Sequence, residues 1–455
     1  MKVKFITLGC KTNQYESNAM GEKFISKGYE ITDDVADVYV INTCAVTNVA
    51  ERKSRQMIRR AKDNNPNAIV VACGCYVQVS KEEAENMPEV DLVLGVNEKQ
   101  NIVELVEDFI KNKQEIVDVT DVMQGEYQEF GTTTYTELNR AVIKVQDGCD
   151  IYCTYCIIPF ARGRVRSREP EKVVKEISDI AKTGIKEVVL TGIHIASYGK
   201  DFTRDEAVKY REQFGYDNNF NEYDDKEDLA SGAFRLIELL EQINKIDGIE
   251  RIRIGSIEPK IVTDDFINRM AKLDKICDHM HLSLQSGSNA TLQRMNRRYT
   301  AEEFKEATDK LRKIYPEIAL TTDVIVGFPG ETDEEFEETY EFLKDIKFYK
   351  LHVFKYSPRK GTAAIKFTNQ VDGNIKEERS KRLIELSDKY ETEYNESYIG
   401  KTVSVLFEER DGEYFKGHTT NYILVKVKTD KDLENQILDV KIDSIDNLEA
   451  IGELV

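Results

Sequence analysis

The stretch that decides how this chain folds is Ala141-Val-Ile-Lys-Val-Gln-Asp-Gly-Cys149-Asp-Ile-Tyr-Cys153-Thr-Tyr-Cys156. It begins with a short apolar run typical of a buried strand, and three cysteines then follow within eight residues. Soft thiolates at this spacing select an iron–sulfur cluster or zinc. A structural zinc site takes four ligands, usually from two paired knuckles, and the sequence has no second Cys-x-x-Cys pair. Three cysteines on a four-iron cluster leave one iron open, so we predict such a cluster here.

Strands and helices alternate along the chain after this segment. Further strands are predicted at Glu187–Thr191, Arg251–Gly255, His281–Leu284, Leu320–Val326 and Leu351–Phe354. Helices are expected to begin near Pro170, Phe234, Thr263, Thr300 and Thr332, and a helix near residues 375–398 closes the region. Six β/α units in series predict a partial (β/α)6 barrel with an open side, and barrels place their active sites at the carboxyl ends of the strands. The cysteines follow the first strand at that end.

The first hundred residues also alternate, with apolar strands at Val3–Leu8, Val38–Asn42, Ile69–Ala72 and Leu92–Leu94. The clearest helices are Val49–Lys62 and Ile102–Lys111. This pattern predicts an open parallel α/β sheet covered by helices on both faces. Residues 113–138, rich in polar side chains, are interpreted as a linker. Cys10, Cys44 and Cys75 follow the first three strands, so they should converge at one sheet edge, and we predict a second cluster there.

Two further cysteines have a simpler interpretation. Cys73 lies within an apolar strand and Cys277 lies near a helix–strand junction, so both are interpreted as buried packing residues. The last stretch, Gly400–Val455, changes to alternating runs separated by Asp-Gly and Lys-Gly turns, which predicts a small antiparallel β-barrel. The predicted domains are residues 1–113, 135–394 and 397–455, with an acid-rich, solvated loop inserted at 200–232.

The bulk composition limits the class of protein. The chain has 455 residues and a net charge of −19, which argues against a generic nucleic-acid coat and requires any RNA binding to use local basic patches. No run of eighteen apolar residues occurs, and the N-terminus turns polar too early for a signal peptide. We therefore expect a cytoplasmic protein with no membrane partner, in which cysteines serve metal binding or catalysis.

Two basic clusters directly follow cluster cysteines. The first is Arg52, Lys53, Arg55, Arg59 and Arg60, and the second is Arg162, Arg164, Arg166 and Arg168. A basic helix face is usually only solvated, but the position of both clusters beside the predicted site makes phosphate binding plausible. Arg52, Arg55, Arg59, Arg162, Arg164 and Arg166 are therefore our candidate RNA contacts. His194 ends the second barrel strand and is equally compatible with a structural or a functional role.

The Cys149, Cys153 and Cys156 spacing resembles that of the radical-SAM superfamily, whose usual core is a partial β/α barrel. The resemblance implies that S-adenosylmethionine binds the open iron and is split into methionine and a 5′-deoxyadenosyl radical. It also implies that Tyr155 lies beside the adenine of the cofactor. Polar residues at strand ends are the other candidate cofactor contacts, namely Ser283, Gln285 and Asp323.

A closer resemblance rests on Thr-Leu-Gly-Cys10-Lys-Thr-Asn-Gln-Tyr-Glu-Ser, Ile-Asn-Thr-Cys44 and Gly-Cys75-Tyr-Val-Gln. With Ile-Ile-Pro-Phe-Ala-Arg-Gly-Arg-Val-Arg-Ser after Cys156, these segments resemble radical-SAM methylthiotransferases, most closely the MtaB-type tRNA enzymes. The family implies two [4Fe-4S] clusters, S-adenosylmethionine, a TRAM-like C-terminal barrel, tRNA as partner and a cytosolic electron donor. The implied reaction adds a methylthio group to C2 of N6-threonylcarbamoyladenosine at position 37 of tRNA. No oligomer is implied.

Two alternatives remain open at this level. From Lys401 to Val455 there are 7 basic and 12 acidic residues, whereas a barrel that clamps RNA is ordinarily basic. An acidic barrel suits a basic protein partner, as in relatives that modify a ribosomal protein side chain. A non-catalytic iron–sulfur protein that binds RNA is the other alternative.

Overall fold

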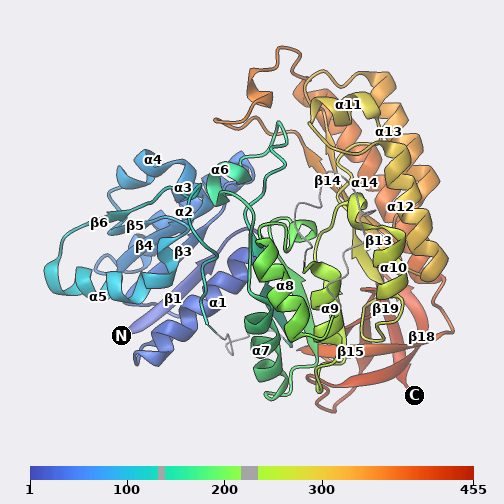
Figure 1. Cartoon of the computed structure of the whole chain (residues 1–455), viewed down its shortest axis with the longest axis horizontal. Helices are drawn as coiled ribbons and strands as arrows, with labels where there is room; N and C mark the ends of the chain where they lie inside the picture. Colours follow the sequence, from blue (N-terminus) through green and yellow to red (C-terminus); the bar gives the residue numbers. More distant parts are fainter. Residues whose placement is uncertain (132–138, 217–233) are drawn as a thin grey trace.

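The computed structural model describes residues 1–131, 139–216 and 234–455. Figure 1 shows a blue N-terminal α/β unit, a central half-barrel in green to orange, and a red C-terminal β-barrel packed beneath it. This mixed α/β architecture with parallel sheets and a small closed barrel is the predicted fold class.

The N-terminal unit is one fully parallel sheet in the order β2-β1-β3-β4-β5-β6. Its strands are β1 (Lys2–Thr7), β2 (Glu30–Ile31), β3 (Val38–Thr43), β4 (Ile69–Gly74), β5 (Leu92–Leu94) and β6 (Ile116–Asp118). Its helices are α1 (Lys11–Ser26), α2 (Asn48–Asn64), α3 (Cys75–Val79), α4 (Lys81–Glu85) and α5 (Ile102–Asn112), with the 3-10 turn η1 (Glu98–Asn101). The strands β3 and β4 are buried on both faces, as continuous apolar runs require.

The predicted linker at 113–138 is corrected in its first part. Residues 116–118 form β6, which pairs with β5 and completes the sheet. The segment after it packs against the half-barrel, because the Tyr127 hydroxyl donates to the carbonyl of Lys144 at 2.7 Å and Phe130 is buried. The strand could not be recognised in the sequence, because the segment is mostly polar and a three-residue strand at a sheet edge needs few apolar side chains. Residues 132–138, and with them the predicted domain start at 135, lie outside the described residues.

Six parallel strands form the central half-barrel. They are β7 (Arg140–Lys144), β10 (Glu187–Thr191), β11 (Arg251–Ile254), β12 (His279–His281), β13 (Ala319–Val326) and β14 (Lys350–Lys355). Two three-stranded ladders, β7-β10-β11 and β12-β13-β14, are joined by isolated bridges such as Ile257 with Leu282. No pairing of β14 with β7 occurs among the described residues, so the predicted partial barrel is open on that side. The predicted fourth strand begins two residues earlier and ends at His281, where regular pairing gives way to these bridges.

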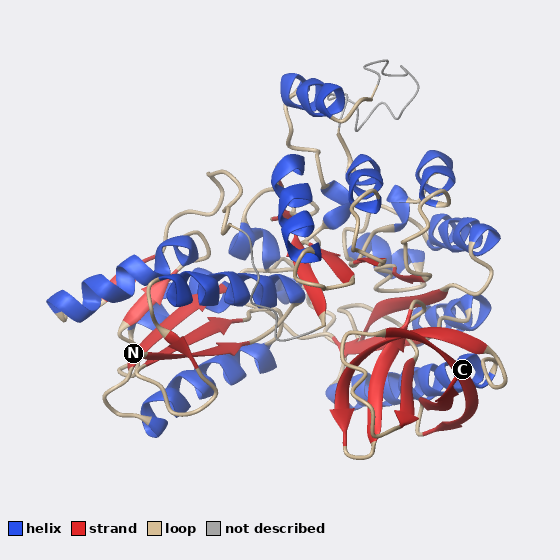
Figure 2. Cartoon of the chain, turned by 90° about the horizontal axis from the view of Figure 1, so that it is seen from below, coloured by secondary structure: helices blue, strands red, loops and turns tan. Residues whose placement is uncertain are grey.

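The helices of this region cover the outer face of the barrel (Figure 2). They are α7 (Pro170–Ala181), α9 (Leu236–Asn244), α10 (Asp264–Met270), α11 (Asn289–Arg294), α12 (Ala301–Ile314), α13 (Asp333–Ile346) and α14 (Gly373–Glu396). Alternation along the strands sends Ile143, Val188 and Ile252 into the shared apolar core with these helices. A capping box formed by Thr332 and Glu335 starts α13, as the sequence indicates.

The acid-rich insertion is only partly a loop. Residues 204–213 form the helix α8 (Arg204–Gln213), which a capping box between Thr203 and Glu206 begins. An aromatic cluster anchors it, with ring centroids of Phe202 and Tyr210 5.0 Å apart and those of Tyr210 and Phe234 6.1 Å apart. The prediction of a solvated loop from residue 200 is therefore wrong for this helix, because a few spaced aromatics suffice to bury it. Residues 217–232 lie outside the described residues.

The C-terminal unit is a closed barrel in the order β15-β16-β17-β19-β18. Its strands are β15 (Thr402–Asp411), β16 (Tyr414–Thr419), β17 (Leu424–Lys428), β18 (Ile437–Asp446) and β19 (Glu449–Leu454). The small barrel is as predicted, except that β17 and β19 pair in parallel, which closes it. None of the described helices has the length and apolar character that crossing a membrane requires.

Arg251 joins the half-barrel to the C-terminal barrel. Its guanidinium donates to the carbonyls of His418 and Ser404, each at 2.9 Å. We expect Arg251→Ala to weaken this docking by about 1–3 kcal/mol, because it removes charged hydrogen bonds to partly buried carbonyls. Faster amide hydrogen exchange in β15 and β16 would report it. Arg410→Ala is the matched control, since Arg410 donates to two carbonyls within the barrel itself; equal effects from both variants would contradict the docking role.

Candidate iron–sulfur and cofactor site

Cys149, Cys153 and Cys156 lie in the loop between β8 (Gln146–Asp147) and α6 (Ile158–Arg162). The loop is held tightly, since the Cys149 amide donates to the carbonyl of Gly163 at 3.0 Å and the Cys156 amide to that of Cys153 at 2.9 Å. Burial raises the pKa of Cys149 to about 11 and that of Cys156 to about 12, and in both cases the neighbouring Cys153 thiol raises it further. The structure therefore brings the three predicted thiols together in a partly buried site.

Gly148 explains why this loop can turn so sharply before Cys149. Its φ of +71° lies in the left-handed region. A Cβ atom at this position would lie 1.8 Å from the carbonyl oxygen of Arg164. Only glycine lets the chain after β8 pass this close to the strand β9 (Arg166–Ser167), with which β8 pairs.

Cys10, Cys44 and Cys75 converge at the carboxyl edge of the N-terminal sheet. Cys10 is the N-cap of α1, Cys44 follows β3, and Cys75 begins α3. Burial raises the pKa of Cys44 to about 11, and the nearby Cys75 and Cys10 thiols contribute to the rise. A Cβ on Gly9 would lie 2.8 Å from the sulfur of Cys44, so this turn also needs glycine.

The remaining cysteines lie in apolar surroundings. Cys73 is fully buried in β4 and packs in the core on the opposite face of the sheet from Cys75. Cys277 is buried beside β11, and burial raises its pKa to about 12.

Arg162 connects the two thiol triads. It ends α6, the short helix that begins two residues after Cys156, and its Nε donates to the sulfur of Cys75 at 3.2 Å. Its Nη2 donates to Oδ1 of Asn13 at 2.5 Å, and the guanidinium also pairs with Glu16. This side chain has no exposed surface. The sequence-based assignment of Arg162 as an RNA contact is therefore corrected to a structural role beside the cysteine.

Arg166 is corrected for the same reason. It is buried, and its Nη2 donates to the carbonyl of Arg162 at 2.7 Å. Arg168 is likewise buried and pairs with Glu176 and Glu129. Sequence alone could not separate these residues from the exposed Arg164, which pairs only loosely with Asp150 at 3.4 Å.

A second arginine lies beside the Cys149 triad. The Nη1 of Arg297 donates to the sulfur of Cys153 at 3.3 Å, and its Nη2 pairs with Glu258 at 2.7 Å. Nε2 of His194 lies 3.1 Å from the other oxygen of Glu258. Burial alone raises the pKa of Glu258, but the hydrogen bond with His194 and the charge of Arg297 outweigh it and hold the pKa at about 2. His194 thus has a defined polar partner at the site.

Neither Glu258 nor Arg297 is among the site residues expected from the sequence. The available signal for Glu258 was its position just after the third barrel strand, where β/α barrels collect functional side chains. Arg297 carries no such signal, because it reaches the thiol from the loop after α11.

Three predicted cofactor contacts lie along β12 and β13: Ser283 and Gln285 follow β12, and Asp323 lies within β13. The amide of Gln285 donates to the carbonyl of Asp323 at 2.8 Å, and Gln285 has a φ of +73°, an uncommon value for a residue other than glycine. Asp323 pairs with His281 at 3.4 Å. The carbonyl of Ser283 accepts from Tyr299, and Tyr155 packs edge-on against Phe328 with centroids 6.4 Å apart. Their role in cofactor binding stays a prediction.

The donor set fits an iron–sulfur cluster better than a single metal ion. Among the described residues, no three histidine, cysteine or carboxylate side chains converge on one ion position. A four-iron cube binds each cysteine through a different iron, so its ligands need not meet at one point. Two sets of three soft thiols, each with an arginine donor on one sulfur, suit such a cube.

The surface of α2 carries the other basic cluster. A shallow groove is lined by Arg52, Arg55, Gln56, Arg59, Arg60 and Asp63. Arg55 and Arg59 approach Glu83 and Glu89 at 3.6 and 3.7 Å. Arg52 and Arg60 are exposed and form no ion pair with another described residue. The N-terminus of α2 meets the half-barrel, where Nδ2 of Asn48 donates to the carbonyl of Pro358 at 2.9 Å.

Comparison with known proteins supports the same architecture. The chain matches the model of the radical SAM superfamily over residues 143–343 and that of the uncharacterized protein family UPF0004 over residues 2–95. It is 42% identical to a threonylcarbamoyladenosine tRNA methylthiotransferase MtaB of Bacillus subtilis, over 97% of this chain and 93% of that protein. The corresponding Aquifex aeolicus protein is 41% identical over 94% and 96%.

More distant matches extend the comparison. A tRNA-2-methylthio-N(6)-dimethylallyladenosine synthase of Thermoanaerobacter is 35% identical, over 99% of this chain and 92% of that protein. Among solved structures, the radical S-adenosylmethionine methyltransferase TsrM of Kitasatospora setae matches with a TM-score of 0.52 and 13% identity, over 77% of this chain and 72% of that one. This structural likeness concerns the fold alone.

Arg162 provides a test of the link between the two triads. We expect Arg162→Leu to lower the free energy of unfolding of the apoprotein by about 3–5 kcal/mol, because it leaves the buried Glu16 with fewer cations. Iron bound after anaerobic reconstitution should also fall, since Cys75 loses its donor. Chemical denaturation and iron analysis measure the two effects. Arg164→Leu, two residues away and exposed, should change stability by less than about 0.5 kcal/mol; similar losses in both variants would contradict the assignment.

Proposed function

Because this chain belongs to the radical-SAM methylthiotransferase family, we propose that it adds a methylthio group to C2 of N6-threonylcarbamoyladenosine at position 37 of tRNA. The observation that carries the proposal is the presence of two thiol triads joined through Arg162. The choice of nucleoside rests on relatives. Proteins named for threonylcarbamoyladenosine match at 42% and 41% identity, and one named for dimethylallyladenosine matches at 35%.

The chemistry of the substrate requires this kind of site. The C2–H bond of adenine is strong and non-acidic, so a general base cannot activate it. S-adenosylmethionine bound at a reduced cluster supplies a carbon radical, which offers a route that acid–base chemistry does not. Cys149, Cys153 and Cys156 would hold that cluster, and Cys10, Cys44 and Cys75 would hold the second, beside which the sulfur is delivered.

The protein contributes fixed charge and orientation around these groups. Arg297 donates to Cys153 and is itself fixed by Glu258, which His194 holds from the other side. Such a chain of hydrogen bonds fixes the direction of the N–H donor toward the sulfur. We assign cofactor binding to Tyr155, Ser283, Gln285 and Asp323. A backbone hydrogen bond from Gln285 to Asp323 supports this assignment, because it holds these two residues next to each other in the half-barrel.

The tRNA would approach along α2. Arg52, Arg55 and Arg59 lie on its exposed face, and the N-terminus of this helix contacts the rim of the half-barrel through Asn48. Arg164 is the remaining candidate of the second basic cluster. The reaction also needs a cytosolic electron donor, and we place the enzyme in the cytoplasm, where its tRNA substrate occurs.

Modification of a ribosomal protein is not favoured. The acidic C-terminal barrel would suit a basic protein substrate, but the relatives described above are named for tRNA nucleosides. A non-catalytic role is not favoured either, since these relatives are named as transferases and match nearly the whole length of this chain.

Nucleoside mass spectrometry of tRNA from a deletion strain tests the function. We expect 2-methylthio-N6-threonylcarbamoyladenosine to disappear, its precursor to accumulate, and a plasmid copy to restore the product. The variants Cys153→Ala and Cys44→Ala should both fail to restore it. In vitro, however, Cys153→Ala should form no 5′-deoxyadenosine, whereas Cys44→Ala should still cleave S-adenosylmethionine.

Two outcomes would count against this assignment. An unchanged 2-methylthio content in the deletion strain would remove the proposed substrate. Equal loss of cofactor cleavage in the two cysteine variants would contradict the division of labour between the triads.

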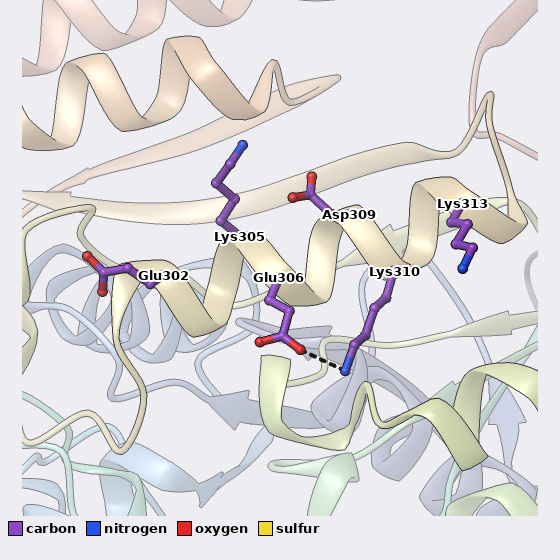
Figure 3. Close-up of a pocket in the computed structure, with 6 residues that line it drawn as sticks. All are labelled: Glu302, Lys305, Glu306, Asp309, Lys310 and Lys313. Atoms are coloured by element: carbon purple, nitrogen blue, oxygen red, sulfur yellow. Dashed lines mark ion pairs between the residues drawn. The ribbon is translucent and has the colours of Figure 1, made fainter.

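The RNA surface of α2 has its own test. Replacing Arg52 and Arg60 with alanine should weaken tRNA binding and reduce the slope of log affinity against log salt by about one unit for each phosphate that the protein no longer neutralises. The matched control is Lys305→Ala with Lys310→Ala on α12 (Figure 3), where Lys310 lies 3.0 Å from Glu306 and Lys305 2.7 Å from Asp345. Binding titrations at several salt concentrations measure the slope; the same drop in the α12 variant would refute a specific surface.

A further inference from the structure

The inner surface of the half-barrel is unusually rich in cations and aromatic rings. The loop between β16 and β17 inserts Tyr422 into its base, where the ring stacks on His279 with centroids 4.9 Å apart. The guanidinium carbons of Arg253 and Arg140 lie 4.7 and 5.5 Å from the centre of the same ring. His281 and His352 continue this lining, with ring centroids 5.6 Å apart. The stacked rings make this interior suited to a flat group.

The arginines at the base are already neutralised. Arg253 pairs with Glu187 at 2.9 Å, and Arg140 pairs with Glu408 at 3.1 Å. Arg251 is used for docking the C-terminal barrel. Burial and the nearby Arg253 hold the pKa of His279 well below its usual range, so that ring is neutral. None of these groups has a charge left for a ligand.

Lys11 is the exception. It interacts electrostatically with Tyr422, Arg140, Arg253 and Glu187 of the half-barrel and its base. It keeps solvent contact and makes no ion pair or hydrogen bond with another residue that the structure describes. Glu187, the carboxylate among these four neighbours, is already surrounded by arginines. This ammonium group is thus an unmatched cation that faces an interior whose arginines are already paired.

The position of Lys11 in the chain places it beside a cysteine of the second triad. It directly follows Cys10 and begins α1, which is fixed to β7 by the pair of Glu16 with Lys144 at 2.7 Å. In adenine, C2 and C6 are both bonded to N1, and C6 carries the N6 substituent, so C2 and this substituent lie on the same edge of the ring. A base whose C2 faces the Cys10 triad would therefore hold its N6 substituent within reach of residues that border the triad, of which Lys11 is one.

We propose that Lys11 binds the carboxylate of the N6-threonylcarbamoyl group and so selects this nucleoside over adenosines with an uncharged N6 substituent. The inference rests on the proposed function. The threonyl moiety carries one carboxylate, which provides the anion that this position lacks. A dimethylallyl group has no charge to offer, and a site built for a charged hydrogen bond disfavours a ligand without it.

The test compares two RNAs that differ only in this charge. Anaerobically reconstituted enzyme is titrated with anticodon stem-loops carrying either N6-threonylcarbamoyladenosine or its carboxamide analogue at position 37. We expect the wild type to prefer the carboxylate by about tenfold. The preference should vanish in Lys11→Gln and Lys11→Met and persist in Lys11→Arg. Lys27→Gln, at the exposed far end of α1, is the matched control and should keep it.

The design separates the possible failures. A ratio of two affinities within one variant cancels any difference in cluster loading, which iron analysis records for each protein. A preference unchanged in Lys11→Gln, or an equal loss of affinity for both RNAs as expected of a phosphate contact, would overturn the inference alone. If the wild type forms no 2-methylthio product on the carboxylate RNA, the proposed function itself fails.

Discussion

The carboxylate of Glu16 lies fully buried between Lys99 at 2.6 Å, Lys144 at 2.7 Å and the guanidinium of Arg162. Burial alone raises the pKa of Glu16, but the charges of Arg162, Lys144 and Lys99 outweigh it and hold the pKa well below its usual range. Lys99 belongs to the N-terminal unit, whereas Lys144 and Arg162 belong to the half-barrel. Without the half-barrel, Glu16 loses two of these three cations and is left with Lys99. The loss of these partners leaves a buried charge poorly compensated, which lowers stability. The two units are therefore fixed to each other by a buried carboxylate whose cations come from both.

This constraint determines where the thiols lie. The N-terminal unit contacts both sides of the barrel opening. On one side, Glu16 of α1 pairs with Lys144 at the end of β7. On the other side, Asn48 of α2 donates to the carbonyl of Pro358 in the loop after β14. From Cys156 the chain needs only the short helix α6 to reach Arg162, which donates to Cys75. The same guanidinium thus holds the domain interface and one ligand of the second triad. A change in domain packing would consequently alter the surroundings of that sulfur, so fold and chemistry depend on the same contacts.

The meeting of Cys10, Cys44 and Cys75 could be predicted because topology brings them together. The ends of parallel strands meet at one edge, so these three cysteines converge although they lie far apart in the chain. Arg162 could not be assigned, because an arginine has the same sequence signature whether it faces solvent or a buried carboxylate. Its partners Glu16 and Asn13 lie far away in the chain, and only tertiary packing brings them together. Glu258 was missed for a related reason, since its function depends on Arg297 and His194 from other loops. The helix α8 was not predicted because its segment is acidic and poor in apolar residues. A few aromatic side chains were nevertheless enough to anchor it.

A net charge of −19 is compatible with an RNA substrate once the charges are sorted by their partners. Arg162 and Arg168 are neutralised inside the protein by glutamates. On α12, Lys310 pairs with Glu306 (Figure 3), and Lys305 pairs with Asp345 of α13. Arg52 and Arg60 on α2 remain exposed without an ion pair among the described residues. Screening at physiological salt limits surface interactions to about 8 Å, so a phosphate responds to the charges of the surface it touches and not to the total. The acidic C-terminal barrel contributes to the site in another way, through Tyr422 and backbone carbonyls that accept from Arg251, and neither contact depends on its surface charge.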